Sequence, residues 1–145
     1  MIDGDARLEW LAQREDLRSL PQRYARAIDA RDIDAVAALF DPEGTVDGAR
    51  GPASVPDYVE MLRQSGPAFQ TTMHVLGDPL ISHEPGSATA HLDTYAVVHQ
   101  LDKVDGSGGD ATLGVRYLDD VVQRGGRWVI RHRQARILWH RASAG

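Results

Sequence analysis

The chain has 145 residues, of which 42% are hydrophobic and 26% are charged, a composition typical of a single globular domain. Its 16 basic and 21 acidic residues give a net charge of −5, which argues against a nucleic-acid partner. It contains no cysteine, so disulfides, thiolate nucleophiles and cysteine-bound metal centres are excluded. No apolar run approaches the roughly 18 residues of a membrane span, and the acidic first ten residues are unlike a signal peptide. We therefore expect a cytoplasmic protein with no membrane partner.

Apolar residues at helical spacing predict three helices in the first half of the chain. The first contains Pro21, which predicts a kink or break because proline lacks a backbone donor, and Ser19 would cap the restarted helix. The second helix is predicted from Asp32, as its N-cap, through Phe40, and the third over residues 54–64.

From residue 70 onward the apolar residues alternate and β-branched types dominate, which predicts strands. The predicted strands are residues 70–82, 88–101, 111–123 and 128–139, with a short additional strand at 45–47. Helices followed by antiparallel strands are typical of the α+β class. We expect one domain, 1–145, with flexible tails at 1–7 and 141–145. A strongly curved sheet packed around the helices would leave a cavity between the layers.

Five polar side chains fall on faces of these elements that we expect to line the cavity. They are Asp29 at the end of the first helix, and His74, Tyr95, His99 and Tyr117 on the strands. A carboxylate bonded to one imidazole nitrogen fixes the tautomer and makes the other nitrogen a better base. The pattern therefore indicates proton transfer. From spacing alone, the alternative is that the histidines are hydrogen-bonded core residues.

Four stretches carry a resemblance to a known family. They are YARAID (24–29), RDIDAVAALF (31–40), TMHVLG (72–77), and the segment 116–133 with RYLDD and GGRWVIRHR. Over about residues 8–140 the chain resembles SnoaL-like proteins of the nuclear transport factor 2-like superfamily. The resemblance implies a cone-shaped α+β barrel, with N-terminal helices packed in a strongly curved antiparallel sheet. It also implies an activity among dehydratases, isomerases and cyclases.

The resemblance also suggests roles for single residues. Asp29 and His74 fall where scytalone dehydratase and a related dehydrochlorinase keep an Asp–His pair, and His99 resembles a second catalytic histidine. Tyr24 is similar in position to a tyrosine of a bile-acid dehydratase, and Arg133 to an arginine of the dehydrochlorinase.

Two departures from scytalone dehydratase imply a different, largely apolar substrate, because two of its tyrosines correspond to Ile28 and Gly48 here. We expect the substrate to be bound by Tyr24, Tyr95, Tyr117 and Arg133. An inward arginine could hold a substrate carboxylate through two parallel hydrogen bonds.

The prediction from these residues is a cofactor-independent lyase or isomerase with catalytic residues Asp29, His74 and His99. It would dehydrate or isomerise a small polyketide-, aromatic- or steroid-like molecule. The alternatives are an intramolecular cyclase and a non-catalytic ligand-binding or dimerisation module. The six histidines show no metal-ligand spacing, so we expect neither metal nor cofactor. The long apolar strands need cover, so we expect a homodimer.

Overall fold

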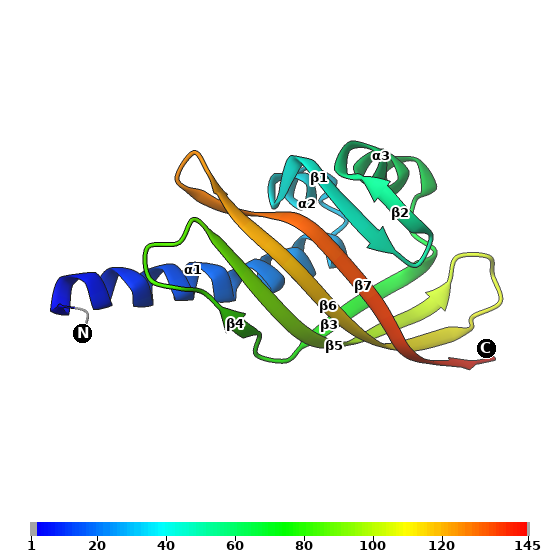
Figure 1. Ribbon diagram of the computed structural model, residues 1–145. Coiled ribbons are helices and arrows are strands. Elements are labelled where there is room, and N and C mark those ends of the chain that lie inside the picture. Colours follow the sequence, from blue (N-terminus) through cyan, green and yellow to red (C-terminus); the bar gives the residue numbers. More distant parts are fainter. Residues whose placement is uncertain (1–2, 145) are drawn as a thin grey trace.

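The computed structural model describes residues 3–144, which form three helices on one face of a seven-stranded sheet (Figure 1). The helices are α1 (Gly4–Asp29), α2 (Ile33–Ala38) and α3 (Val55–Ser65). The strands are β1 (Phe40–Gly48), β2 (Gly51–Ser54), β3 (Phe69–Leu76), β4 (Leu80–Ser82), β5 (Thr89–Lys103), β6 (Asp110–Arg124) and β7 (Arg127–Ser143). None of the helices in the described part of the chain is long and apolar enough to cross a membrane.

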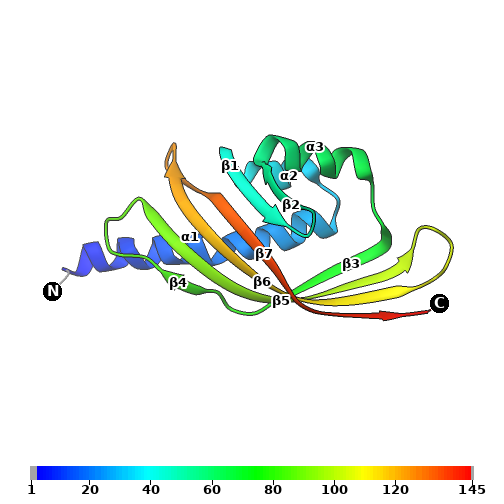
Figure 2. The same cartoon turned by 45° about the vertical axis from the view of Figure 1, so that its right-hand side comes forward.

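The strands follow the order β2-β1-β7-β6-β5-β3, and β4 adds to β5. Only the pairing of β1 with β7 is parallel among the described strands. The long strands β5, β6 and β7 bend as they cross α1, while α2, α3 and the β1–β2 hairpin lie together on one side (Figure 2). Two register shifts between β6 and β7 increase the local twist, as bulges do. The curved sheet therefore wraps around α1.

The core lies between α1 and the inner face of the sheet. Leu17 and Leu20 of α1, Leu92 of β5 and Ile130 of β7 have no exposed surface. Full burial of such side chains contributes roughly 1.5–3 kcal/mol each. This packing confirms the predicted α+β class, with N-terminal helices packed in a strongly curved antiparallel sheet.

Helix α1 continues through Pro21, so the predicted break there is wrong. Ser19 does not cap a new helix, because its hydroxyl donates to the carbonyl oxygen of Asp16 at 2.7 Å. An interior proline costs a helix about 3 kcal/mol. Leu17, Leu20 and Tyr24, on either side of the proline, are 0–7% exposed, and their burial outweighs that cost.

Three other boundaries differ from the sequence-based expectation. Phe40 begins β1 instead of ending a helix, because its backbone joins the parallel pairing with Ile130. The predicted strand 70–82 is divided by residues 77–79, where Pro79 cannot donate to the sheet. Helix α1 begins at Gly4 and β7 reaches Ser143, so the described parts of the expected tails are regular structure. Residues 1, 2 and 145 lie outside the described residues.

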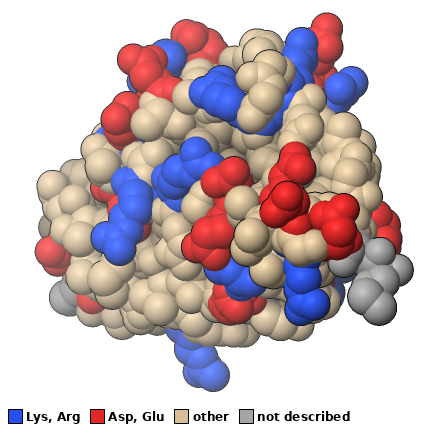
Figure 3. Space-filling view, turned by 90° about the vertical axis from the view of Figure 1, so that its left-hand side faces the viewer, with Lys and Arg blue, Asp and Glu red and all other residues tan. Residues whose placement is uncertain are grey.

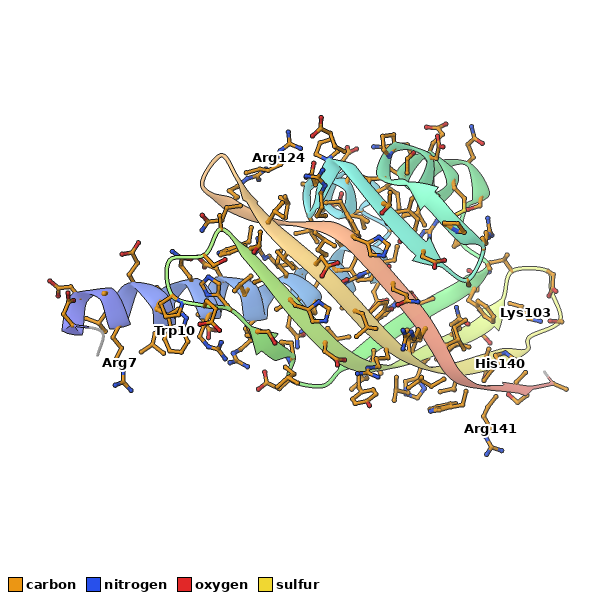
Figure 4. All side chains as sticks on the ribbon, in the orientation of Figure 1. Arg7, Trp10, Lys103, Arg124, His140 and Arg141 are labelled. Atoms are coloured by element: carbon orange, nitrogen blue, oxygen red, sulfur yellow. The ribbon has the colours of Figure 1, made fainter. Side chains whose placement is uncertain are left out.

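Asp41 fixes the start of β1 to the β6–β7 hairpin. It is fully buried and accepts hydrogen bonds from the Glu43 backbone N–H at 2.9 Å, from Arg124, and from Arg131 at 3.2 Å. Arg124 lies at this end of the molecule, where acidic and basic side chains are interspersed over the surface (Figures 3 and 4). Burial by itself would raise the pKa of Asp41, but the Glu43 N–H and the two arginines hold it below 3.8.

We expect Asp41→Asn to lower the free energy of unfolding by about 1–3 kcal/mol at pH 7, because it removes charge-assisted bonds from a buried group. A carboxyl whose pKa is lowered by folding stabilises the protein above its ordinary pKa. That contribution is lost as the pH falls through the folded value. Urea unfolding at pH 7 and pH 3 should therefore give a smaller difference between variant and wild type at pH 3. Glu43→Gln, which alters an exposed acid beside Arg124, is the control and should change stability little. An Asp41→Asn effect that is equal at both pH values would contradict this assignment.

Candidate active site

A cavity of about 480 Å³ lies between the inner face of the sheet, the C-terminal half of α1, α3 and the β1–β2 hairpin. This volume falls within the roughly 300–1,000 Å³ of small-molecule sites. Most of the wall is apolar, and polar side chains enter it at a few places. The apolar wall includes Ile28, Val46, Met61, Val98, Val115 and Ile137.

Asp29 and His74 meet at one side of the cavity, as the sequence predicted. The Nδ1 atom of His74 lies 2.6 Å from Oδ1 of Asp29, and the His74 backbone N–H donates to Oδ2 at 2.8 Å. Thr72 also donates its hydroxyl to Oδ1 at 3.0 Å. Because a carboxylate only accepts, Nδ1 of His74 is the donor in this contact, and when the ring carries one proton Nε2 is the nitrogen that can accept another. The His74 side chain is 9% exposed and lines the cavity.

Three tyrosines add phenol groups to the cavity wall. The hydroxyls of Tyr24 and Tyr58 lie 3.1 Å apart, so one donates to the other and the second O–H remains available. Burial raises the pKa of Tyr58 well above its ordinary value, and it raises the pKa of Tyr117 as well. The phenols of Tyr58 and Tyr117 therefore stay protonated and can donate hydrogen bonds. The Tyr24 ring also packs edge-on against the His74 ring, with centroids 6.1 Å apart.

Arg133 is almost completely buried between two of these rings. Its Cζ lies 4.2 Å from the centroid of Tyr24 and 4.4 Å from that of Tyr117. Its Nε and Nη2 donate to both carboxylate oxygens of Asp119, at 2.7 and 2.9 Å. Burial would lower the pKa of Arg133, but Asp119 holds it above its ordinary value.

Asp119 occupies the Nε–Nη2 side of the Arg133 guanidinium, so the predicted two-bond grip on a substrate carboxylate would have to use the remaining hydrogens of Nη1 and Nη2, and it stays a prediction. Nη1 of Arg133 is buried and has no hydrogen-bond partner among the described residues. Since Arg133 also lines the cavity, the NH2 group of Nη1 is available to donate to a bound molecule.

Tyr95 and His99 were predicted to face the cavity, and both predictions are wrong. Alternation along β5 directs Val98 and Gln100 into the cavity, so Tyr95 and His99 lie on the outer face of the sheet. Tyr95 is 61% exposed there. Both faces of β5 carry apolar residues, such as the adjacent Val97 and Val98, so hydrophobicity alone did not fix which face is buried.

Two cavity residues were missed by the sequence analysis as functional groups. Tyr58 was expected to be a core residue of the third helix, and Gln100 was not considered. Gln100 is paired with Thr72 across β5 and β3, so its amide lies beside the Asp29–His74 pair. Helical spacing predicts that Tyr58 faces the interior of the protein. Only the tertiary structure shows that its phenol lines a cavity instead of packing into the core.

Within residues 3–144, no three His, Asp or Glu side chains gather closely enough to hold a metal ion. The absence of a cofactor stays a prediction.

Asp119→Ala should lower the free energy of unfolding by about 3–5 kcal/mol, because it leaves the buried Arg133 charge unpaired. Asp120→Ala is the matched control, since the adjacent Asp120 is exposed and pairs only with His91. It should cost about 0.5 kcal/mol or less. Chemical denaturation of both variants measures the difference, and equal effects would contradict the buried pairing.

The fold is shared with several solved structures. A hexachlorocyclohexane dehydrochlorinase from Novosphingobium barchaimii has a TM-score of 0.80 at 16% identity, covering 95% of this chain and 94% of that one. A proposed scytalone dehydratase from Novosphingobium aromaticivorans has a TM-score of 0.81 at 20% identity, covering 96% and 91%. A nuclear transport factor 2 (NTF2-like) superfamily protein from Salmonella enterica has a TM-score of 0.75 at 18% identity, covering 85% and 89%.

No curated protein sequence matches the chain. The family model of the SnoaL-like domain matches residues 9–134. This range runs from the second turn of α1 to Gln134 in β7, and it includes Asp29, His74 and Arg133. The chain therefore belongs to the family of SnoaL-like domains, with the cone-shaped fold of the NTF2-like superfamily.

Proposed function

We propose that this protein is a cofactor-independent lyase or isomerase in which Asp29 orients His74 as a general base. The observation that carries the proposal is the 2.6 Å contact between Nδ1 of His74 and Oδ1 of Asp29 at the wall of an apolar cavity. Since Nδ1 is engaged, Nε2 is left to accept a proton from a bound molecule. Three hydrogen bonds on one carboxylate fix its position and, through it, the imidazole.

The chemistry begins with removal of a proton from a carbon next to a carbonyl or phenol-like group by Nε2 of His74. The electron pair moves to the oxygen, and hydrogen-bond donors stabilise the resulting enolate. In a dehydration, the enolate collapses and expels a hydroxyl from the neighbouring carbon. That hydroxyl takes up the proton held by Nε2 of His74 and leaves as water, so the imidazole is ready for another cycle. In an isomerisation, the proton returns to a different carbon.

The hydrogen-bond donors for these steps are the protonated phenols and the Nη1 group of Arg133. The Tyr24–Tyr58 pair keeps one hydroxyl proton available, and Nη1 of Arg133 is an unpaired donor on a retained positive charge. Since His99 lies on the outer face, it has no role in this mechanism. Gln100 is the polar group that β5 supplies.

Two further observations support the proposal. A largely apolar cavity of about 480 Å³ suits a fused-ring or polyketide-like molecule. Proteins of the same fold include a dehydrochlorinase and a proposed scytalone dehydratase, whose names describe elimination reactions. Fold alone does not determine a reaction, so the Asp29–His74 geometry carries the assignment.

An intramolecular cyclase would use the same base, and the mass of the product separates the two. Dehydration removes one water, whereas cyclisation and isomerisation conserve mass. A non-catalytic binding module would bind ligands independently of the base. Thermal stabilisation by a ligand that persists in His74→Ala, without turnover in wild type, would favour this third function.

Asp29→Asn and His74→Ala should each lower turnover by about 10²–10⁴-fold, the range for loss of a general base. The measurement is mass-resolved turnover of a panel of β-hydroxy carbonyl and phenol-like compounds. The chain offers a matched control in a second Asp–His pair on its surface. His91 contacts Asp120 at 3.0 Å outside the cavity, and His91→Ala should leave turnover unchanged. Full activity in both Asp29→Asn and His74→Ala would contradict the proposed mechanism.

We also propose that the outer face of the sheet pairs with a second copy of the chain. Its exposed apolar side chains come from β3, β5 and β7 and are 40–61% exposed. They are Met73, Val75, Tyr95, Leu101 and Trp139. Because a Cβ on Gly114 would lie 2.0 Å from Nε1 of Trp139, the missing side chain lets the indole lie against the sheet. A contiguous apolar face of this kind marks an interaction site.

Val75→Lys should shift the wild-type dimer to monomer in analytical ultracentrifugation, because it places a charge in the apolar face. Leu8→Lys is the control. Leu8 is 67% exposed on the N-terminal half of α1, away from this face, and its replacement should leave the dimer intact. A wild-type chain that sediments as a monomer at all concentrations would rule out the pairing.

A further inference from the structure

The cavity has a charged inner part, an apolar middle and a charged opening. In the interior, the charges are compensated, since Asp29 is bonded to His74 and Arg133 to Asp119. The charged side chains that line the cavity are Asp29, Arg31, Arg50 and Arg133. Arg31 and Arg50 are exposed, whereas Arg133 is buried, so these two arginines form the charged rim.

The two rim arginines have no acidic partner. None of the ion pairs among residues 3–144 includes Arg31 or Arg50. The chain as a whole has a net charge of −5, yet the opening of this cavity carries two positive charges. A positive rim on an acidic protein raises the local concentration of anions.

The conformation of Arg31 holds its side chain toward the cavity. Its φ of 56° lies in the left-handed region, which is uncommon for residues other than glycine. The turn is fixed because Arg31 N–H donates to Ile28 at 3.1 Å and Asp32 N–H donates to Ala27 at 3.0 Å. The guanidinium in turn reaches the carbonyl of Leu62 on α3 at 3.4 Å. The two backbone bonds form the Schellman arrangement that commonly ends helices, so the end of α1 fixes the point from which the Arg31 side chain extends.

We propose that Arg31 and Arg50 bind an anionic group of the substrate at the cavity opening, while the apolar body of the substrate occupies the interior. The substrate class is therefore an apolar ring or chain that ends in a carboxylate or phosphate. This inference rests on the proposed function only in naming the bound molecule as substrate. The anion-binding step is independent of the Asp29–His74 chemistry.

The test uses two fluorescent probes with the same apolar body, 1-pyrenebutyrate and 1-pyrenebutanol, which differ in the terminal charge. Fluorescence titration of the full chain at low salt should show that the carboxylate binds about three- to tenfold more tightly than the alcohol, as expected for two exposed ion pairs. The preference should decrease as salt is added, because exposed charges are screened.

The informative variant is Arg31→Asn with Arg50→Gln, since asparagine tolerates a left-handed backbone. It should bring the ratio of the two dissociation constants close to one and leave the affinity for the alcohol unchanged. The charge-conserving variant Arg31→Lys with Arg50→Lys should retain most of the preference. Arg127→Gln, on the β6–β7 hairpin, should retain all of it.

Three outcomes would overturn the proposal. They are equal affinity for the two probes in wild type, a preference that survives the Arg31→Asn, Arg50→Gln variant, and no binding of either probe. The second outcome would place the anion at Arg133 instead of at the rim. His74→Ala should keep the probe preference while losing turnover, so failure of the rim and failure of the base are distinguishable.

Discussion

The Asp29 carboxylate bonds the C-terminal end of α1 to β3. Asp29 ends α1 and accepts three hydrogen bonds from β3, two from His74 and one from the hydroxyl of Thr72. The contact fixes where α1 stops, where β3 lies against it, and which way the His74 ring faces. The cavity exists because the chain beyond Asp29 turns away to α2 and α3 while the sheet curves on. The structural contact and the proposed base are therefore the same atoms.

A second buried charge supports this arrangement from the other side of the cavity. Arg133 lies between the rings of Tyr24 and Tyr117 and is paired with Asp119. Tyr24 belongs to α1, so the guanidinium also connects the sheet to the helix. Removing the two charges of such an ion pair from water costs free energy, and this cost offsets much of the stability that the pair adds. The Nη1 group of Arg133 has no hydrogen-bond partner among residues 3–144, which supports the proposed role toward a bound molecule.

The two faces of the sheet carry different kinds of side chains. The inner face carries the Asp29–His74 pair, the phenols and the buried arginine, and it encloses the proposed substrate. The outer face carries exposed apolar side chains from β3, β5 and β7, including Tyr95, and His99 lies on the same face. The rim arginines add a third feature, because they give a negatively charged protein a positive cavity opening. The proposed reaction and the proposed anion binding use the cavity, whereas the proposed pairing of two copies uses the outer face of the sheet.

The order of helices and strands, the α+β class and the meeting of Asp29 with His74 followed from periodicity and from the resemblance of local motifs. Periodicity reports local backbone geometry, so it also reliably placed Thr72, His74 and Leu76 on one side of β3. It could not decide which side of β5 is inside, because both sides are apolar, and His99 was assigned to the wrong face. Nor could it show that Pro21 sits within one continuous helix or that Asp119 occupies the fork of Arg133. Those features depend on packing and pairing between segments distant in the chain, which only the tertiary structure decides.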